Sequence, residues 1–240
     1  MLLAAGRGER MRPLTDHTPK PLLAVRGQPL LHWALSKLAA GGVTGAVLNT
    51  AWLGERIEQH FGPVFEDAQG SQVALRYSRE QVPGEAFSAL ETAGGISRAL
   101  PWLDEVFWVA AGDVYAPDFH FGADDLAAFA ASDHLAHIWL VPNPPEKPRG
   151  DFGLTPQGLA TSWPHEGDAG YTYSTIGLYR RALFEAPWCE IEPGNPAGEK
   201  APLAPLLRTA MDAGRVSAQL YTGRWTDVGT PERLAKLNAD

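Results

Sequence analysis

The chain begins with a short apolar run, residues 1–5, that stops at a glycine and opens into a cationic loop. The loop contains Gly6, Gly8 and Arg10, and Lys20 follows between two prolines. Glycine lets backbone N–H groups approach phosphate oxygens closely, while arginine and lysine neutralise charge that N–H dipoles cannot. This feature constrains the fold because it predicts a buried strand whose end feeds a polyphosphate-binding loop.

Two better-known phosphate loops do not fit this segment. A Walker A loop would need Gly-Lys-Ser/Thr after its spacer, and the dinucleotide fingerprint would need a third glycine where this chain has Met11. Gly-x-Gly alone is also typical of an ordinary strand-to-helix turn. The longer string, Leu-Ala-Ala-Gly-x-Gly-x-Arg-Met-x-Pro-Leu-Thr-x-x-x-Pro-Lys-Pro-Leu, crowds cations beside bare backbone. Because such crowding costs stability unless an anion compensates it, the string favours polyphosphate binding. Arg7 and Arg12 read as solvated surface arginines.

Strand-like apolar runs recur along the chain and alternate in several places with helical patterns. Residues 29–40 start with Pro29, which is favourable at a first helical position, and 201–213 form a second helical pattern that closes at Gly214. Thr230, directly before a proline, has the signature of a helix N-cap. The alternation predicts an α/β fold with a largely parallel sheet and helices on both faces. The predicted strands are 46–49, 73–77, 106–110, 135–141 and 175–179.

The composition is that of an acidic globular protein. The 240 residues carry a formal net charge of −8, so the cations near the N-terminus predict a local anion site and no nucleic-acid partner. Cys189 is the only cysteine, which excludes an intramolecular disulfide. The sequence has neither a bilayer-spanning apolar segment nor a signal peptide, so we expect no membrane partner and a cytoplasmic location. A central strand usually runs about 5–6 residues, so the early loop also predicts a native start a few residues upstream of Met1.

Two aspartates are candidate metal ligands. Gly112-Asp113 follows an apolar run and therefore lies at the tip of a predicted strand, whereas Asp227 comes just before a predicted helix. Mg²⁺ is typically held by one or two carboxylates, with waters and substrate phosphates completing its octahedron. Each aspartate alone also fits a structural role, Asp113 in a turn and Asp227 in the approach to a helix.

Together, the loop, Gly112-Asp113 and Trp225-Thr226-Asp227-Val228-Gly229-Thr230 closely resemble the signatures of the sugar-phosphate nucleotidyltransferases. The resemblance implies a Rossmann-like fold, the nucleotide-diphospho-sugar transferase fold. It implies a single domain over 1–240, with a nucleotide-binding half at about 1–115 and a sugar-binding half at about 116–240. A sugar 1-phosphate would attack the α-phosphorus of a nucleoside triphosphate, and pyrophosphate would leave. The implied catalytic residues are Arg10, Lys20, Asp113 and Asp227, the two aspartates holding the cofactor Mg²⁺.

Within the family, the chain looks most like the N-acetylmuramate α-1-phosphate uridylyltransferases of cell-wall (peptidoglycan) recycling. Its short length and local strings such as Arg149-Gly150-Asp151-Phe152 support this similarity. By resemblance, UTP and N-acetylmuramate α-1-phosphate are the small-molecule substrates. The implied nucleotide-binding residues are Ala5, Gly6, Gly8, Lys20, Glu80, Thr92, Gly94 and Gly112. The implied sugar-binding residues are Asn143, Asp151 and Ser174, of which Asn143 also fits a turn role and Asp151 a loop-capping role.

Three other functions stay open from the sequence. A mannose-1-phosphate guanylyltransferase or a glucose-1-phosphate thymidylyltransferase would share the same signatures. A catalytically silent nucleotide-sugar sensor is expected to lose an aspartate or the equivalent of Lys20, and this chain keeps them all. The loop between Glu80 and Leu90 is expected to be longer than in close relatives. A monomer fits the compact chain, and a dimer is not excluded.

Overall fold

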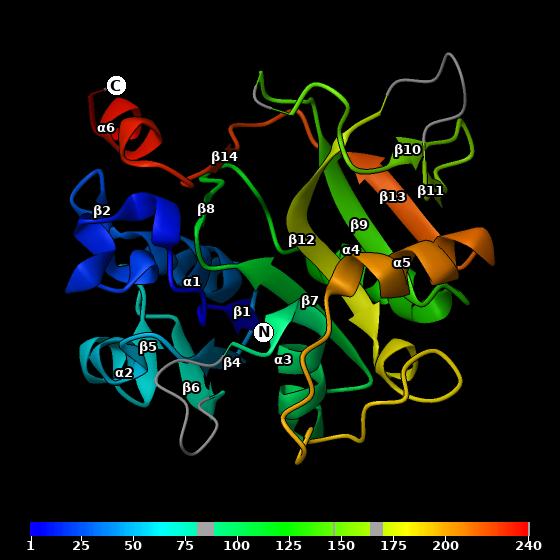
Figure 1. Ribbon diagram of the computed structural model, residues 1–240, viewed down its shortest axis with the longest axis horizontal. Helices are drawn as coiled ribbons and strands as arrows, with labels where there is room; N and C mark the ends of the chain where they lie inside the picture. The colour runs from blue at the N-terminus through cyan, green and yellow to red at the C-terminus, as the bar shows by residue number, and fades with distance from the viewer. Residues whose placement is uncertain (81–88, 146, 164–169, 240) are drawn as a thin grey trace. The chain divides into compact units, whose positions relative to one another are not determined.

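The computed structural model describes residues 1–80, 89–145, 147–163 and 170–239 (Figure 1). The expected long loop between Glu80 and Leu90 therefore lies almost entirely outside the described residues. The chain divides into two compact units. The first comprises Met1–Leu90, Ala110–Ala123 and Gly223–Asp240, and the second comprises Glu91–Val109 and Asp124–Thr222. The assignment of a nucleotide-binding half before residue 115 and a sugar-binding half after it stays a prediction.

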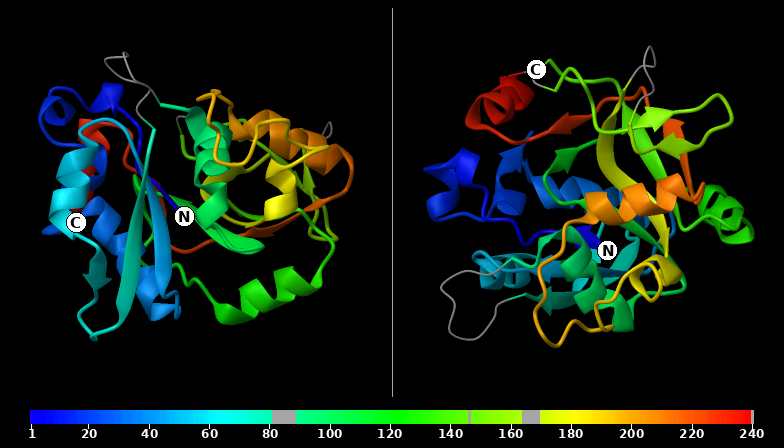
Figure 2. Two further views of the ribbon diagram at one scale, coloured as in Figure 1. Left: turned by 90° about the horizontal axis from the view of Figure 1, so that it is seen from below. Right: turned by 45° about the vertical axis from the view of Figure 1, so that its right-hand side comes forward.

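The first unit contains a mostly parallel sheet. Its strands are β1 (Leu2–Leu3), β4 (Gly45–Thr50), β5 (Val64–Glu66), β6 (Gln72–Arg79) and the end of β7 (Val106–Ala111). The order is β7-β1-β4-β6-β5. β1 runs parallel to β4 and β7, β4 runs parallel to β6, and β5 is antiparallel to β6. β4 and β6 lie side by side over most of their length (Figure 2).

Among its described residues, the first unit also contains two short antiparallel pairs, three α-helices and three short 3₁₀ helices. The pairs are β2 (Ala24–Val25) with β3 (Gln28–Pro29) and β8 (Val114–Tyr115) with β14 (Thr226–Asp227). The α-helices are α1 (Leu30–Ala40), α2 (Gly54–Phe61) and α6 (Pro231–Ala239). The short 3₁₀ helices are η1 (Glu9–Met11), η2 (Leu14–Asp16) and η3 (Lys20–Leu22). α1 packs against β5 and β6, α2 against β4, and α6 against β2.

Helix α1 begins one residue later than predicted. Pro29 has φ −52° and ψ 142°, an extended conformation, so it precedes the helix and the first helical residue is Leu30. The helix buries Leu31 and Leu35 completely, as its apolar stripe predicts. At its end, a Cβ on Gly41 would lie 2.1 Å from the carbonyl oxygen of Phe121, so this position requires glycine.

One cluster of buried apolar residues joins the loop region to the C-terminal helix. It consists of Met11, Leu23, Val25, Leu30, Tyr115, Val228 and Leu234, with Trp33 and Leu237 packed against it. Burial of such side chains contributes roughly 1.5–3 kcal/mol each. The residues that flank the predicted phosphate loop therefore share a core with α6.

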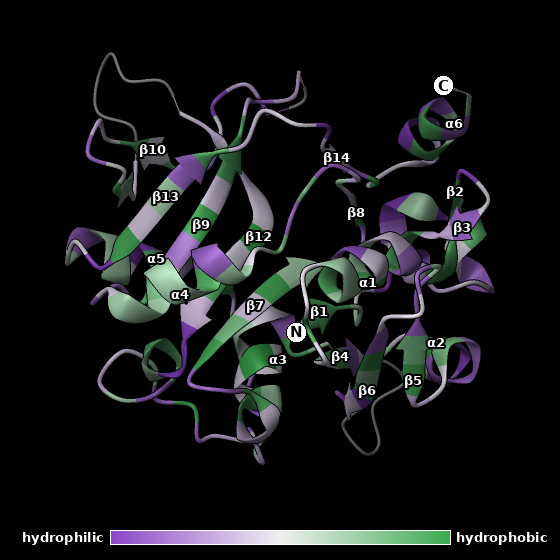
Figure 3. Cartoon of the chain, turned by 180° about the vertical axis from the view of Figure 1, so that it is seen from behind, coloured by the Kyte–Doolittle hydropathy of each residue, from purple (hydrophilic) through white to green (hydrophobic). Residues whose placement is uncertain are grey.

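In the second unit the strands follow the order β13-β9-β12-β7. β9 (Ala136–Val141) is antiparallel to β12 (Thr172–Arg180) and parallel to β13 (Val216–Leu220). β10 (Gly153–Leu154) pairs with β11 (Ala160–Thr161). The helices are α3 (Glu91–Ala99), α5 (Leu203–Asp212), η4 (Leu100–Trp102), η5 (Arg181–Phe184) and α4 (Ala123–Ala131), whose first residue belongs to the first unit. Hydrophobic residues dominate β7 (Figure 3).

The predicted α/β architecture is confirmed. Four predicted strands lie within β4, β6, β7 and β12, and the fifth matches β9 apart from its first residue. The 201–213 pattern forms α5, and Thr230 caps α6 by accepting a hydrogen bond from the backbone N–H of Arg233 at 3.4 Å. In the described part of the chain, every helix is too short or too polar for a membrane crossing.

Candidate functional site

The two glycines of the N-terminal loop differ in why glycine is present. Gly8 has φ 67° and ψ 42°, a left-handed conformation, and a Cβ there would lie 3.0 Å from Cγ2 of Thr15 and 3.4 Å from Cβ of Lys20. Gly6 is exposed, and a Cβ there would meet no described atom within 4 Å. Gly8 is thus required by the turn itself, whereas Gly6 leaves open space beside the backbone.

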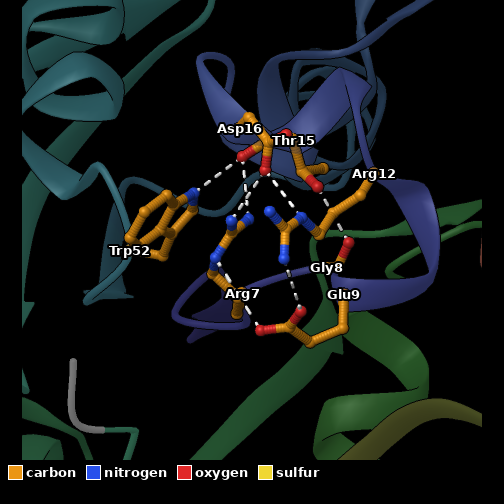
Figure 4. A network of polar contacts seen from close by, with 7 residues as sticks. All are labelled: Arg7, Gly8, Glu9, Arg12, Thr15, Asp16 and Trp52. Carbon is orange, nitrogen blue, oxygen red and sulfur yellow. Dashed lines mark hydrogen bonds and ion pairs between the residues drawn. The ribbon is translucent and has the colours of Figure 1, made fainter.

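Arg7 is a structural anchor of this loop (Figure 4). Its guanidinium lies 3.7 Å from the ring centroid of Trp52 and donates hydrogen bonds to the carbonyl oxygen of Thr15 and to Oδ1 of Asp16, both at 2.9 Å. Only 13% of the side chain is exposed. The expectation of a solvated surface arginine was wrong for Arg7, because the stacking partner comes from residue 52 and the pairing is not visible in the local sequence.

Asp16 accepts from two arginines at once (Figure 4). Besides Arg7, the Nε of Arg12 donates to the same Oδ1 at 2.8 Å, and Arg12 is 57% exposed, as expected for a surface residue. The hydrogen bond from Arg7, followed by the charge and hydrogen bond of Arg12, lowers the pKa of Asp16. Trp52 also donates from Nε1 to the carbonyl oxygen of Thr15 at 2.9 Å. The loop is therefore held in a fixed shape by residues of the first unit.

The pairing of β8 with β14 brings the two predicted metal ligands together. Asp227 pairs with Val114, and the backbone N–H of Val228 donates to the carbonyl oxygen of Asp113 at 3.0 Å. Lys20 links the two side chains. Its Nζ lies 2.5 Å from Oδ2 of Asp113 and 4.0 Å from Oδ1 of Asp227, and the lysine side chain is 10% exposed. Lys20, Asp113 and Asp227 thus form one cluster, although the first and last of them are more than two hundred positions apart in the sequence.

Arg10 is directed to the same cluster. It is exposed, and its Nη2 lies 3.2 Å from the position that a Cβ on Gly229 would take. That position is also 3.2 Å from both carboxylate oxygens of Asp227. A side chain at residue 229 would therefore intrude between the guanidinium of Arg10 and the carboxylate of Asp227.

Sequence reasoning missed Arg233, which contacts this cluster. Its Nη1 lies 3.2 Å from the carbonyl oxygen and 3.1 Å from Oδ2 of Asp227. Arg233 belongs to α6, and no motif in the sequence links it to the aspartate. Its position three residues after the helix-capping Thr230 is the signal that could have pointed to it, since that spacing directs a long side chain back over the first turn.

Asp113 and Asp227 supply carboxylate oxygens, the kind of ligand that a hard divalent cation takes. The Lys20 ammonium group lies within ion-pair distance of both carboxylates, so the cluster accommodates a positive charge beside Asp113 and Asp227. Among the described residues there is no group of three or more His, Cys, Asp or Glu side chains placed to hold a metal. Mg²⁺ does not require one, because substrate phosphates and waters supply its remaining oxygens.

Gly112 has a packing role at the start of this site. Its N–H donates to the carbonyl oxygen of Leu3 at 2.8 Å, and a Cβ would lie 2.9 Å from that oxygen. Glycine at this position therefore lets β1 approach the end of β7. Ala5, in the same region, is buried with 6% exposed.

Glu80 is tied into the first unit from both sides. It is 1% exposed, and its carboxylate accepts from Nδ2 of Asn49 at 2.7 Å and from the backbone N–H of Leu90 at 2.8 Å. Asn49 in turn accepts from the N–H of Ala4 at 2.8 Å. These hydrogen bonds connect the start of the loop between Glu80 and Leu90 to the segment that precedes the glycine loop. The contact of Glu80 with the nucleotide base stays a prediction.

The predicted sugar-binding residues lie together in the second unit, around the start of β12. Asn143 donates to the carbonyl oxygens of Pro148 and Gly170 and accepts from Oγ1 of Thr172 at 2.9 Å. Asp151 accepts from the N–H of Tyr173 at 2.9 Å and pairs with Nζ of Lys147 at 2.5 Å. Ser174 is fully buried. Asn143 and Asp151 thus stabilise the loop in the way their alternative roles predict, and their contact with a sugar stays a prediction.

The remaining predicted nucleotide-binding residues lie on α3 of the second unit. Gly94 is buried, its N–H lies 3.1 Å from the carbonyl oxygen of Ala201, and its own carbonyl oxygen accepts from Nδ2 of Asn195 at 3.1 Å. Thr92 is partly exposed on the same helix. The backbone of Gly94 is therefore engaged within its own unit.

Known proteins resemble the chain over its whole length. The family model described as Nucleotidyl transferase matches residues 1–240. The chain is 46% identical over 241 residues to the N-acetylmuramate alpha-1-phosphate uridylyltransferase of Neisseria meningitidis serogroup B, covering 100% of this chain and 96% of the relative. It is 30% identical over 246 residues to the protein of the same name from Caulobacter vibrioides, covering 100% and 94%.

The fold has a counterpart among solved structures. A candidate glucose-1-phosphate thymidylyltransferase from Bacillus anthracis, crystallised with sucrose, aligns with a TM-score of 0.77 over 99% of this chain and 92% of that chain, at 21% identity. Such a likeness supports the architecture alone, whereas the sequence matches extend from the glycine loop through the second aspartate to the C-terminus. The chain belongs to the nucleotidyl transferase family.

Proposed function

We propose that the protein is a Mg²⁺-dependent uridylyltransferase that joins UTP to N-acetylmuramate α-1-phosphate and releases pyrophosphate. The observation that carries the proposal is the position of Lys20, 2.5 Å from Asp113 and 4.0 Å from Asp227, in the segment that follows the glycine loop. The choice of substrates rests on the two relatives of that name, which align with this chain over its full length.

The chemistry needs no protein nucleophile, because the attacking sugar phosphate is already ionised at neutral pH. Catalysis then depends on positioning and on charge neutralisation. The backbone at Gly6 is open to phosphate oxygens, Arg10 neutralises the departing pyrophosphate, and Lys20 neutralises charge at the α-phosphate. Asp113 and Asp227 hold the cation, which when bound supplies Lewis-acid polarisation of phosphoryl oxygens.

The proposal also names the residues that would select the nucleotide base and the sugar. Asn143, Asp151 and Ser174 bring an amide, a carboxylate and a hydroxyl into one part of the second unit, and we propose that this polar part of the unit receives the sugar ring. Polar groups of this kind discriminate between substrates more sharply than apolar contacts do. Glu80, Thr92 and Gly94 remain the proposed contacts of the base.

One assay tests the function. The purified protein is incubated with each of UTP, GTP and dTTP against N-acetylmuramate, N-acetylglucosamine, mannose and glucose 1-phosphates, and pyrophosphate release is followed with and without Mg²⁺. The highest kcat/KM is expected for UTP with N-acetylmuramate α-1-phosphate. A higher value for GTP with mannose 1-phosphate or dTTP with glucose 1-phosphate would establish one of those alternatives. Binding without turnover in any combination would indicate a sensor.

A further inference from the structure

The two carboxylate oxygens of Asp227 face different partners. Oδ2 lies 3.1 Å from Nη1 of Arg233, and the same nitrogen lies 3.2 Å from the carbonyl oxygen of Asp227. Oδ1 faces Nζ of Lys20 at 4.0 Å. Oδ2 is therefore held by an arginine of α6, while Oδ1 faces the side on which the Lys20 ammonium group lies.

The arginine that holds Oδ2 is itself fixed by its helix. Thr230 caps the first turn of α6, and Leu234 packs into the cluster that contains Val228. At the other end, Asn238 donates to the carbonyl oxygen of Ala24 at 3.0 Å and accepts from the N–H of Arg26 at 2.7 Å. α6 packs against β2 and lies near it in Figure 1. Because α6 is held at both ends, the backbone position from which the Arg233 side chain extends is fixed.

We propose that Arg233 is a positioning residue for the metal-binding carboxylate, holding Oδ2 of Asp227 so that Oδ1 is presented to a divalent cation. The proposal rests on the proposed metal role of Asp227. The direction in which metal affinity changes when Arg233 is removed distinguishes this role from a simple charge effect. A cation beside a carboxylate weakens metal binding electrostatically, so removing Arg233 would tighten binding if charge were its only contribution. If orientation dominates, removal weakens binding, and losing a partner of this kind typically lowers metal affinity about 10–100-fold.

The test measures metal binding directly. Mn²⁺ alone is titrated into the wild-type protein and into Arg233→Ala and Arg233→Lys, and free Mn²⁺ is followed by electron paramagnetic resonance. We expect Arg233→Ala to raise the Mn²⁺ dissociation constant about 10-fold or more. Arg233→Lys keeps a donor and is expected to lie between Ala and wild type. Arg224→Ala is the matched control, because Arg224 pairs with an exposed aspartate, Asp118, at 2.6 Å, and its Mn²⁺ affinity is expected to equal that of wild type.

Several outcomes overturn the proposal. Equal or tighter Mn²⁺ binding by Arg233→Ala assigns the arginine no positioning role, and so does an absence of Mn²⁺ binding by wild type. If Arg233→Ala does not fold, by circular dichroism, Arg233→Lys decides alone, and a wild-type dissociation constant in that variant counts against the proposal. Turnover is measured separately, so failure of every substrate pair would refute the proposed function while the binding comparison still decides the role of Arg233.

Discussion

Lys20 donates a hydrogen bond to Oδ2 of Asp113 at 2.5 Å, and this pair joins the phosphate loop to the strand end that carries the first predicted metal ligand. The lysine is 8% exposed, so its charge is balanced mainly by protein groups in this state. Leaving a charge of this kind without its partner is costly. In the proposed site, a bound cation would pair with the Asp113 carboxylate and a triphosphate with the Lys20 ammonium group. Replacing either residue is therefore a sensitive test of that site.

Replacing Lys20 or Asp113 by alanine is expected to reduce kcat at least about 100-fold, the cost of removing one preorganised electrostatic contact in a transition state. The two variants should differ in their response to metal. In Lys20→Ala the carboxylates of Asp113 and Asp227 lose their shared cation, so Mg²⁺ should raise its melting temperature more than that of wild type. Lys236→Ala, on the exposed side of α6, is the control and should keep full turnover. Near-wild-type turnover in Lys20→Ala or Asp113→Ala would refute that residue's role.

Arg7→Ala is expected to lower the free energy of unfolding by about 1–2 kcal/mol, because it removes a cation–π contact and two hydrogen bonds from a side chain that is mostly buried. Arg12→Ala provides a matched comparison in the same loop. This variant also removes an ion pair with Asp16, but the Arg12 side chain is largely exposed. The free energy of unfolding should therefore fall by less than about 0.5 kcal/mol. Urea unfolding of both variants measures the difference. Equal losses would show that the stacking of Arg7 on Trp52 adds no stability.

Gly229→Ala is expected to keep the fold and lose activity. The added Cβ would lie 3.2 Å from Arg10 and from the Asp227 carboxylate, tighter than an ordinary van der Waals contact, so one of them must move by a few tenths of an ångström. Small misplacements at a phosphoryl-transfer site are costly, so we expect kcat to fall roughly 10–100-fold. Pyrophosphate release and a thermal melt measure the two effects. Gly70→Ala is the control: a Cβ there meets no described atom within 4 Å, and although its φ of 85° adds backbone strain, kcat should not change. Unchanged kcat in Gly229→Ala would show that the gap beside Arg10 is not needed.

The sequence predicted the parts of the site that local patterns encode. The strand-to-loop transition at Gly6, the strand that ends before Gly112-Asp113 and the cap at Thr230 each follow from residues within a few positions of one another, and the structure has all three. Patterning succeeds here because backbone conformation and strand burial are largely decided by neighbours.

The missed parts depend on partners far along the chain. Arg7 is buried by Trp52, and the structural role of Glu80 depends on Asn49 and on the N–H of Leu90. A single sequence does not specify which distant groups a polar side chain will meet, because that is decided by strand pairing and loop packing in the folded state. Gly112 is an example. The reason for a glycine there is seen only in the folded structure, where its backbone nitrogen lies 2.8 Å from the carbonyl oxygen of Leu3.

The stability of the protein is expected to depend on pH through His137 of the second unit. His137 lies on β9, where its Nδ1 is 2.8 Å from Oγ of Ser217 and its ring contacts the ring of Trp139. Burial, and secondarily the charge of His134, lowers the pKa of His137 from 6.5 to about 4. The unfolded chain therefore binds a proton that the folded chain does not between these two values. Stability is present in full above pH 6.5 and is lost as the pH falls towards about 4, by at most about 3 kcal/mol.

Urea unfolding at pH 7 and at pH 4.5 measures this loss. His137→Gln keeps a hydrogen-bonding side chain but does not titrate, so its stability should fall less than that of wild type over the same interval. His120→Gln, which replaces an exposed histidine, should follow wild type. An identical pH dependence in wild type and His137→Gln would mean that the imidazole is protonated as readily in the folded chain as in the unfolded one, because the variant removes no carboxylate and leaves the other titrating groups in place.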